Sequence, residues 1–240
     1  MVANVKPQYN PVETDDPVKQ ILARFRHAQE IKDQWMAIFE ECYEYALPQR
    51  ESFYDESIGR RRTDRIFDET AVVGVQEFAS RLQAGLVPNY ARWAEFMAGT
   101  EIPKDQQKEV NAMLDDVTEY VFEILQNSNF SQEVHETFLD IALGTGVLLV
   151  EEGDAVHPIK FKAVPLPHVC LNSGHDDKID SVYRKRKIRF KELEIAYPGA
   201  ELSDMMMMDM EKNPDKACDV VEVVYKNYNS KKHDEFKFRA

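Results

Sequence analysis

The sequence predicts an α+β fold in which long N-terminal amphipathic helices are followed by a mostly antiparallel, β-rich region with short helices. Up to residue 146, apolar side chains recur every three or four residues, which is the period of a helix that buries one face. From residue 147, short runs of β-branched and aromatic residues alternate with turn residues, a pattern typical of strands. We therefore expect a flexible arm (1–14), a helical region (15–146) and a β-rich α+β region (147–240).

The first helix is expected to begin at Pro17, a residue that suits the first helical turn, after a cap at Asp15 or Asp16. Its apolar stripe continues for about thirty residues, to Ala46, which gives a rod of roughly 45 Å. A helix of this length is long for a compact domain. It suits either an extended helix across a larger body or a helix that spans neighbouring subunits of a ring.

The most regular helical pattern lies between residues 64 and 86, and Pro88 forbids its continuation. Acidic residues come early in it, where they suit the positive end of the helix dipole. The expected buried stripe consists of Ile66, Phe67, Val72, Val75, Phe78, Ala79, Leu82 and Leu86. Trp93 follows the stop and sits beside Arg92, whose guanidinium could stack on its ring. We expect Trp93 to be buried, with little solvent exposure, and to anchor the end of this helix.

Two further helices are expected, from 103 to about 126 and from 130 to Gly144, Thr145 and Gly146. A nucleotide site places such glycines between a strand and the helix that follows it, so that the helix N-terminus meets phosphate. Here the glycines follow a helix and lead into a strand. A helix C-cap is therefore the better interpretation.

The β-rich region is expected to contain a turn at Gly153 and Asp154 and a short helix at 190–197. The expected strands lie at 147–150, 159–164, 169–171, 179–188, 220–228 and 235–239. Lysines and arginines in 179–188 are expected to face outward at alternate positions. The pattern stops at Ala240 in a strand with nothing beyond it, so we expect the sheet to be truncated or completed by another chain.

A run of methionines stands out after the short helix. Met205, Met206, Met207 and Met208 are consecutive and lie in an acidic, helical setting. Because consecutive residues cover every face of a helix, some of these side chains must be exposed or meet a partner. We favour an adaptable contact surface over metal binding.

Composition and charge exclude several classes of protein. The net charge of −13 argues against a general nucleic-acid binder, which needs a basic face. It remains compatible with a conduit whose walls repel DNA. Cys42, Cys170 and Cys218 are far apart, which favours buried thiols in a reducing compartment. The chain shows no signal peptide and no membrane-spanning run, so we expect it to be made in the cytoplasm and to have no membrane contact.

The candidate contact residues are Arg60, Arg61, Arg62 and Arg65, in a polar loop before the second helix. The planar guanidinium binds carboxylates and phosphates equally well. Three interpretations are open: a solvated charge run, ion pairs between subunits, or contact with DNA.

An enzyme is not expected, because the sequence contains no catalytic elbow, metalloprotease helix or phosphate-binding loop. A metal site could be drawn from His157, His168, His175, Asp176 and Asp177. Their spacing matches no recognised site, and loop histidines beside aspartates are usually solvated. We therefore expect no catalytic residue, no metal and no cofactor.

An ordered set of segments resembles the portal, or head-to-tail connector, proteins of short-tailed bacteriophages. The set begins with the end of the first helix at Leu47, Pro48, Gln49 and Arg50, followed by the arginine-rich loop. It continues with Asp68, Glu69 and Thr70, the helix after them, and the segment from Arg92 to Phe96. Residues 138–154 and 181–199 resemble the helix-to-strand and strand-to-helix passages of that family. The resemblance covers about residues 15–230.

The resemblance implies a structural virion component with a wing-like α+β fold. It implies a homo-oligomeric ring, a dodecamer, at the portal vertex of the capsid, through which double-stranded genomic DNA is packaged and ejected. The implied partners are further copies of the chain, capsid protein, tail or adaptor proteins and a terminase motor. Members of that family are longer, so the chain resembles an N-terminal portion. The alternative is an α+β interaction or scaffolding protein unrelated to DNA translocation.

Overall fold

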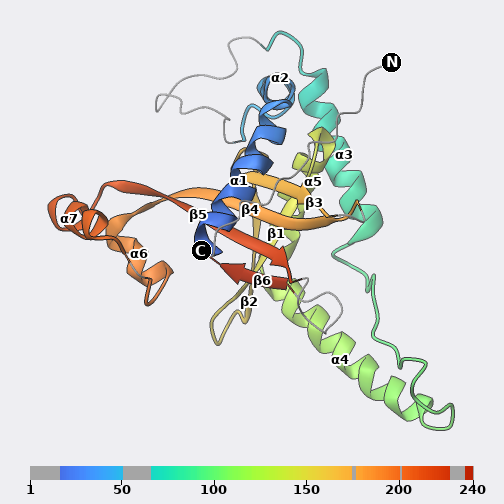
Figure 1. Ribbon diagram of the computed structural model, residues 1–240. Coiled ribbons are helices and arrows are strands. Elements are labelled where there is room, and N and C mark those ends of the chain that lie inside the picture. Colours follow the sequence, from blue (N-terminus) through green and yellow to red (C-terminus); the bar gives the residue numbers. More distant parts are fainter. Residues whose placement is uncertain (1–16, 51–65, 175–176, 201, 228–235, 240) are drawn as a thin grey trace. The chain divides into compact units, whose positions relative to one another are not determined.

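The structure is a computed structural model that describes residues 17–50, 66–174, 177–200, 202–227 and 236–239 (Figure 1). Helices and antiparallel sheets both occur in it, which confirms the predicted α+β class. Contacts divide the chain into two compact units, residues 1–37 with 168–240 and residues 38–167. The boundary predicted between 146 and 147 coincides with the start of the first strand. The two units follow a different division, because they group the first helix with the later strands.

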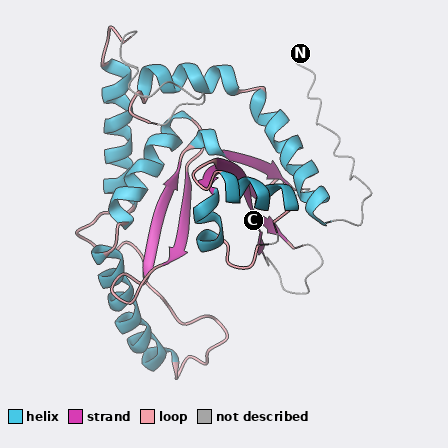
Figure 2. Ribbon diagram, turned by 90° about the vertical axis from the view of Figure 1, so that its left-hand side faces the viewer, coloured by secondary structure: helices cyan, strands magenta, loops and turns pink. Residues whose placement is uncertain are grey.

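The unit of residues 38–167 is built from helices and one hairpin. Its elements are α2 (Met36–Ala46, which begins just before the unit), α3 (Thr70–Leu86), α4 (Gln107–Asn127), α5 (Phe130–Leu143), β1 (Val147–Glu152) and β2 (Ile159–Val164). A 3-10 helix, η1 (Leu166–His168), follows β2. Figure 2 shows β1 and β2 side by side as an antiparallel ribbon. The core consists of Tyr43, Leu47, Ala79, Leu139 and Leu166.

The turn between β1 and β2 confirms the prediction at Gly153 and Asp154. The Gly153 N–H donates to the Pro158 carbonyl at 2.9 Å, and the Asp154 N–H donates to the His157 carbonyl at 2.9 Å. A Cβ at position 153 would lie 1.8 Å from the His157 carbonyl oxygen, so only glycine fits. Hydrogen bonds from the His157 and Val156 N–H groups lower the pKa of the Asp154 carboxyl.

The glycines after α5 end the helix and lead directly into β1, as predicted. The Gly144 N–H donates to the Asp140 carbonyl at 3.0 Å, which closes the last helical turn. A Cβ on Gly146 would lie 2.6 Å from the Thr137 carbonyl oxygen. The second glycine therefore lets the strand leave close against the helix.

The other unit packs one helix on a four-stranded antiparallel sheet of order β3-β4-β5-β6. Its elements are α1 (Pro17–Asp33), β3 (Val169–Ser173), β4 (Ile179–Arg189), α6 (Phe190–Ala196), α7 (Asp204–Lys212), β5 (Ala217–Lys226) and β6 (Phe236–Arg239). Phe25 and Ala28 of α1 pack on Cys170, Tyr183 and Val223, which lie side by side on adjacent strands. The apolar stripe of α1 thus covers one face of the sheet.

The basic residues of β4 lie on both faces of the sheet, which corrects the prediction that they all face outward at alternate positions. Lys185 is exposed and pairs with Asp219, as expected for an outward side chain. Arg184 and Arg186 instead approach Glu222 at 3.2 and 3.0 Å and are only partly exposed. The Tyr197 hydroxyl also donates to Glu222, at 2.5 Å. A buried carboxylate on the neighbouring strand holds both arginines against the sheet, and the sequence of β4 alone does not show it.

The expected rod from Pro17 to Ala46 is wrong. α1 ends at Asp33, the Trp35 N–H donates to the Lys32 carbonyl at 2.8 Å, and α2 begins at Met36. The break adjoins the boundary between the two units, where the buried stripe changes from one core to the other. Because the turn between α1 and α2 keeps the three- and four-residue spacing of the apolar side chains, that spacing does not predict the break.

The predicted second helix is confirmed as α3, but its buried stripe is shorter than expected. Ile66 and Phe67 precede the helix, and Phe67 is 95% exposed. Phe78 and Leu86, inside the helix, are also exposed, so these members of the predicted stripe are wrong. The Asp68 carboxylate accepts hydrogen bonds from the Thr70 N–H (2.8 Å) and hydroxyl (2.5 Å), which lower its pKa. These local bonds precede the helix, whose N-cap residue is Glu69, and the two earlier apolar residues lie outside it.

Candidate functional site

The arginines proposed as contacts, Arg60, Arg61, Arg62 and Arg65, lie outside the described residues. The described residues on either side of this segment have defined contacts. After the segment, the Asp68 carboxylate accepts a hydrogen bond from the Thr70 N–H, at the first residue of α3. On its N-terminal side, Arg50 is bound into the core of the unit of residues 38–167.

Among the arginines of this unit that the structure describes, Arg50 makes the most hydrogen bonds. Its Nε lies 3.2 Å from Asp140 Oδ1, and its Nη2 bonds Asp140 Oδ2, so the guanidinium grips the carboxylate at two points. Nη1 bonds Glu136 Oε2 at 2.5 Å, and Nη2 also donates to the Glu136 carbonyl at 3.1 Å. The Arg50 side chain is 11% exposed and that of Asp140 is 0% exposed.

Tyr43 completes this cluster. Its hydroxyl donates to Asp140 Oδ1 at 2.7 Å, and the ring is buried. Burial and the neighbouring Asp140 raise the pKa of Tyr43, so the phenol stays neutral. Burial by itself would lower the pKa of Arg50. The hydrogen bond with Asp140 and the negative charge of Asp140 have the larger combined effect, so the pKa of Arg50 is raised. The cluster joins α2 and the segment after it to α5.

Sequence reasoning missed this cluster. The available signal was an acidic residue within an apolar run, because Asp140 lies between Leu139 and Ile141 on α5. A carboxylate at such a position needs a buried partner. The sequence does not say which of the many arginines supplies it.

Trp93 has the expected aromatic surroundings but not the expected burial. Its ring stacks on Phe130 with centroids 6.0 Å apart, and it meets the edge of Phe122 at 5.4 Å. The side chain is nevertheless 40% exposed, so the prediction of little exposure is wrong. Arg92 pairs with Asp115 at 2.5 Å. The rings border an open pocket of about 310 Å³ between the end of α3 and the start of α5.

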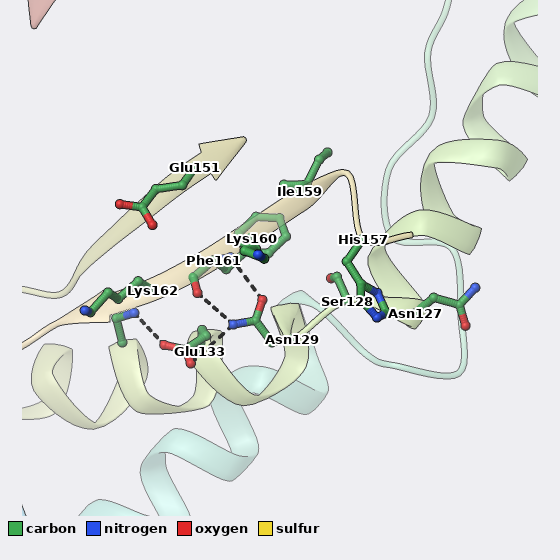
Figure 3. Close-up of a pocket in the computed structure, with 11 residues that line it drawn as sticks. Asn127, Ser128, Asn129, Glu133, Glu151, His157, Ile159, Lys160, Phe161 and Lys162 are labelled. Atoms are coloured by element: carbon green, nitrogen blue, oxygen red, sulfur yellow. Dashed lines mark hydrogen bonds between the residues drawn. The ribbon is translucent and has the colours of Figure 1, made fainter. Parts of the chain in front are cut away.

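A larger pocket of about 540 Å³ lies between the end of α4, the start of α5 and β2 (Figure 3). Three of its polar side chains join these elements. Ser128 donates to the Leu125 carbonyl at 2.8 Å and accepts from the Phe130 N–H at 3.1 Å. Asn129 and Glu133 bond the backbone of β2. These bonds make the pocket a joint between α4, α5 and β2.

The suggested histidine–aspartate metal set is only partly described, because His175 and Asp176 lie outside the described residues. Within the described part of the chain, no three His, Cys, Asp or Glu side chains gather as metal ligands would. No helix in that part is long and apolar enough to cross a membrane.

The methionine run forms the body of α7, which begins after a Ser203 cap that accepts from the Met206 N–H at 3.4 Å. Met205, Met207 and Met208 are exposed, and no residue of the helix is buried. This agrees with the expectation that consecutive methionines leave some side chains in solvent.

The chain belongs to the family described as bacteriophage head to tail connecting protein, whose sequence profile matches residues 18–240. It is also 25% identical over 175 residues to the probable portal protein of Bordetella phage BPP-1. That alignment covers 71% of this chain and 31% of the phage protein, so the chain spans about a third of the length of this relative.

Proposed function

We propose that this chain is part of a phage portal, a ring of identical copies at one capsid vertex. Double-stranded DNA would pass through the ring into the head during packaging and out of it during ejection. The observation that carries the proposal is the family match over residues 18–240. The similarity to a probable portal protein supports it.

The physical features of the chain suit the wall of such a ring. Arg50, Tyr43 and Asp140 join α2 and the segment after it to α5 in a buried cluster. Asn129, which precedes α5, and Glu133 of α5 bond the backbone of β2. These joints resist deformation because separating them would leave buried charges unpaired. The net charge of −13 would also reduce adhesion of passing DNA.

The proposal assigns the expected partners to the complete protein. Capsid protein would hold the ring at the vertex, and tail or adaptor proteins would bind it after packaging. A terminase motor would drive the DNA and would bind the ring only during packaging. The role of the chain itself is structural, without a catalytic step.

The test uses the full-length gene product. We expect the purified protein to form rings with a central channel in electron micrographs, a dodecamer if the family resemblance holds. A phage with a stop codon in this gene should make heads without DNA, and a plasmid-borne copy should restore packaging. A monomeric protein, or DNA-filled heads without it, would refute the portal and favour an interaction or scaffolding protein.

A further inference from the structure

Helix α4 carries an apolar face that the described residues leave largely uncovered. Apolar side chains recur along it at alternating steps of three and four residues, which is the spacing of a helix that packs against a partner. These side chains, called here the α4 face, are Val110, Met113, Val117, Tyr120 and Ile124. Met113 is 66% exposed, Val117 is 47% exposed and Tyr120 is 63% exposed.

The other side of α4 packs against the segment that follows α3. Thr118 and Phe122 are buried on that side. The Thr118 hydroxyl accepts from the Phe96 N–H at 3.1 Å, and the ring of Phe122 lies 5.4 Å from that of Trp93. Because each helical residue turns the chain by about 100°, the α4 face points away from these contacts.

A row of carboxylates borders the α4 face. Glu109, Asp116 and Glu123 recur every seven residues, so they form one row along the helix, and all three are exposed. No lysine or arginine lies three or four residues from any of them, where it could pair along the helix. Within the described part of the chain, none of the three forms an ion pair. A partner for this surface would therefore present cations together with apolar side chains.

A segment of the same chain has this chemistry. Residues 60–67 include Arg60, Arg61, Arg62 and Arg65 and end with Ile66 and Phe67. The Phe67 side chain is 95% exposed, so it does not lie on α4 of its own copy. Figure 1 shows that α3, which Phe67 precedes, begins at the end of the unit remote from α4.

The lengths of the two surfaces agree. The row from Glu109 to Glu123 covers fourteen helical steps, which is about 21 Å. Eight residues can span at most about 28 Å. The segment 60–67 is therefore long enough to reach all three carboxylates.

We propose that residues 60–67 of one copy dock on the α4 face of the next copy. The arginines pair with Glu109, Asp116 and Glu123, and Phe67 packs on the apolar side chains beside them. Because the segment and the α4 face are different surfaces, the contact is head-to-tail, the type that closes into rings. The inference rests on the proposed ring and names the surfaces that join its subunits.

Cysteine cross-linking in the full-length protein tests where Phe67 lies. The double variant Val117→Cys/Phe67→Cys should give a ladder of covalent multimers on a non-reducing gel after mild oxidation. The matched control is Glu119→Cys/Phe67→Cys, because Glu119 is exposed but lies about 200° around α4 from Val117. The control and the unsubstituted protein, which tests the native cysteines, should give no ladder.

Reversal of charge on each surface gives a second measurement. Asp116→Lys/Glu123→Lys should lose most of its rings in electron micrographs, and so should Arg61→Glu/Arg62→Glu. A chain that carries all four substitutions should regain rings, because the two reversed surfaces again attract each other.

The matched control for charge reversal is Glu95→Lys/Glu119→Lys. It makes the same change of net charge at exposed positions away from the α4 face, so it should keep its rings. Because Asp116, Glu123 and both control residues are exposed, the thermal melts of these variants should stay close to that of the unsubstituted protein.

The outcomes separate this contact from the proposed function. A ladder from the first cysteine pair, with rings restored by the combined reversal, supports the contact even if phage without the protein fill their heads with DNA and refute the portal. Rings that form without a ladder, or that survive both reversals, overturn the contact and leave the portal standing. A cross-link confined to single chains also overturns the contact, because the segment would then lie on α4 of its own copy. A protein that stays monomeric at all concentrations overturns both.

Discussion

Removing the Asp140 carboxylate should strongly destabilise the unit of residues 38–167. Asp140→Ala leaves the guanidinium of Arg50, which is 11% exposed, without its two-point partner. Breaking a buried ion pair in this way costs about 3–5 kcal/mol. Tyr43 also loses the acceptor of its hydroxyl. Because Glu136 still meets Arg50 at 2.5 Å, we expect the lower part of that range, about 3–4 kcal/mol of unfolding free energy.

The assay is urea unfolding followed by circular dichroism. The matched control is Asp115→Ala, which breaks the exposed pair with Arg92 and should cost at most about 1 kcal/mol. The double variant Arg50→Met/Asp140→Leu should recover much of the loss, because it leaves no unpaired charge in the core.

Equal losses in Asp140→Ala and Asp115→Ala would refute this reasoning. They would show that water reaches Arg50 and screens it as it screens a surface residue. A double variant as unstable as Asp140→Ala would show that packing, rather than an unpaired charge, dominates the cost.

Three further predictions concern the arginine-rich loop, Trp93 and Tyr43. If Arg60, Arg61, Arg62 and Arg65 pair with carboxylates of a neighbouring copy, replacing them with glutamine should lower the yield of rings in electron micrographs. Normal rings with defective packaging would instead indicate that these arginines contact DNA. Trp93→Ala should lower the unfolding free energy by roughly 2 kcal/mol in urea melts, which is less than the cost for a fully buried indole, because the contacts of Trp93 with Phe122 and Phe130 are partly in solvent. An unchanged melt with loss of the oligomeric ring would instead place Trp93 at a subunit contact. Burial and Asp140 raise the pKa of Tyr43 above its ordinary 10.0, so as the pH rises this phenol ionises first in the unfolded chain, and the stability of the fold should fall above that pH. The drop in the urea midpoint between about pH 9 and about pH 11 should be smaller in Tyr43→Phe than in the unsubstituted protein, and equal drops would contradict the role of Tyr43 in this pH dependence.

The parts of this protein that depend on neighbouring residues were predictable from sequence. The α+β class, the turn at Gly153 and the glycines between α5 and β1 all follow from local period and local backbone geometry. The resemblance to head-to-tail connectors also came from ordered local segments, and the family match confirms it. The sequence further indicated that the methionines of α7 could not all be buried, because consecutive residues cover every face of a helix.

The remaining features depend on partners that are distant in the chain. Arg50 meets Asp140 across 90 residues, and Glu222 holds two arginines of the neighbouring strand. The break between α1 and α2 arises where the buried stripe changes core, and the period does not change there. The backbone of β2 is bonded by Asn129 and Glu133, which precede their partners by 32 and 30 residues. A sequence records which groups need partners, but the folded chain selects them, because a buried charge or backbone group is satisfied only by atoms brought within hydrogen-bonding distance.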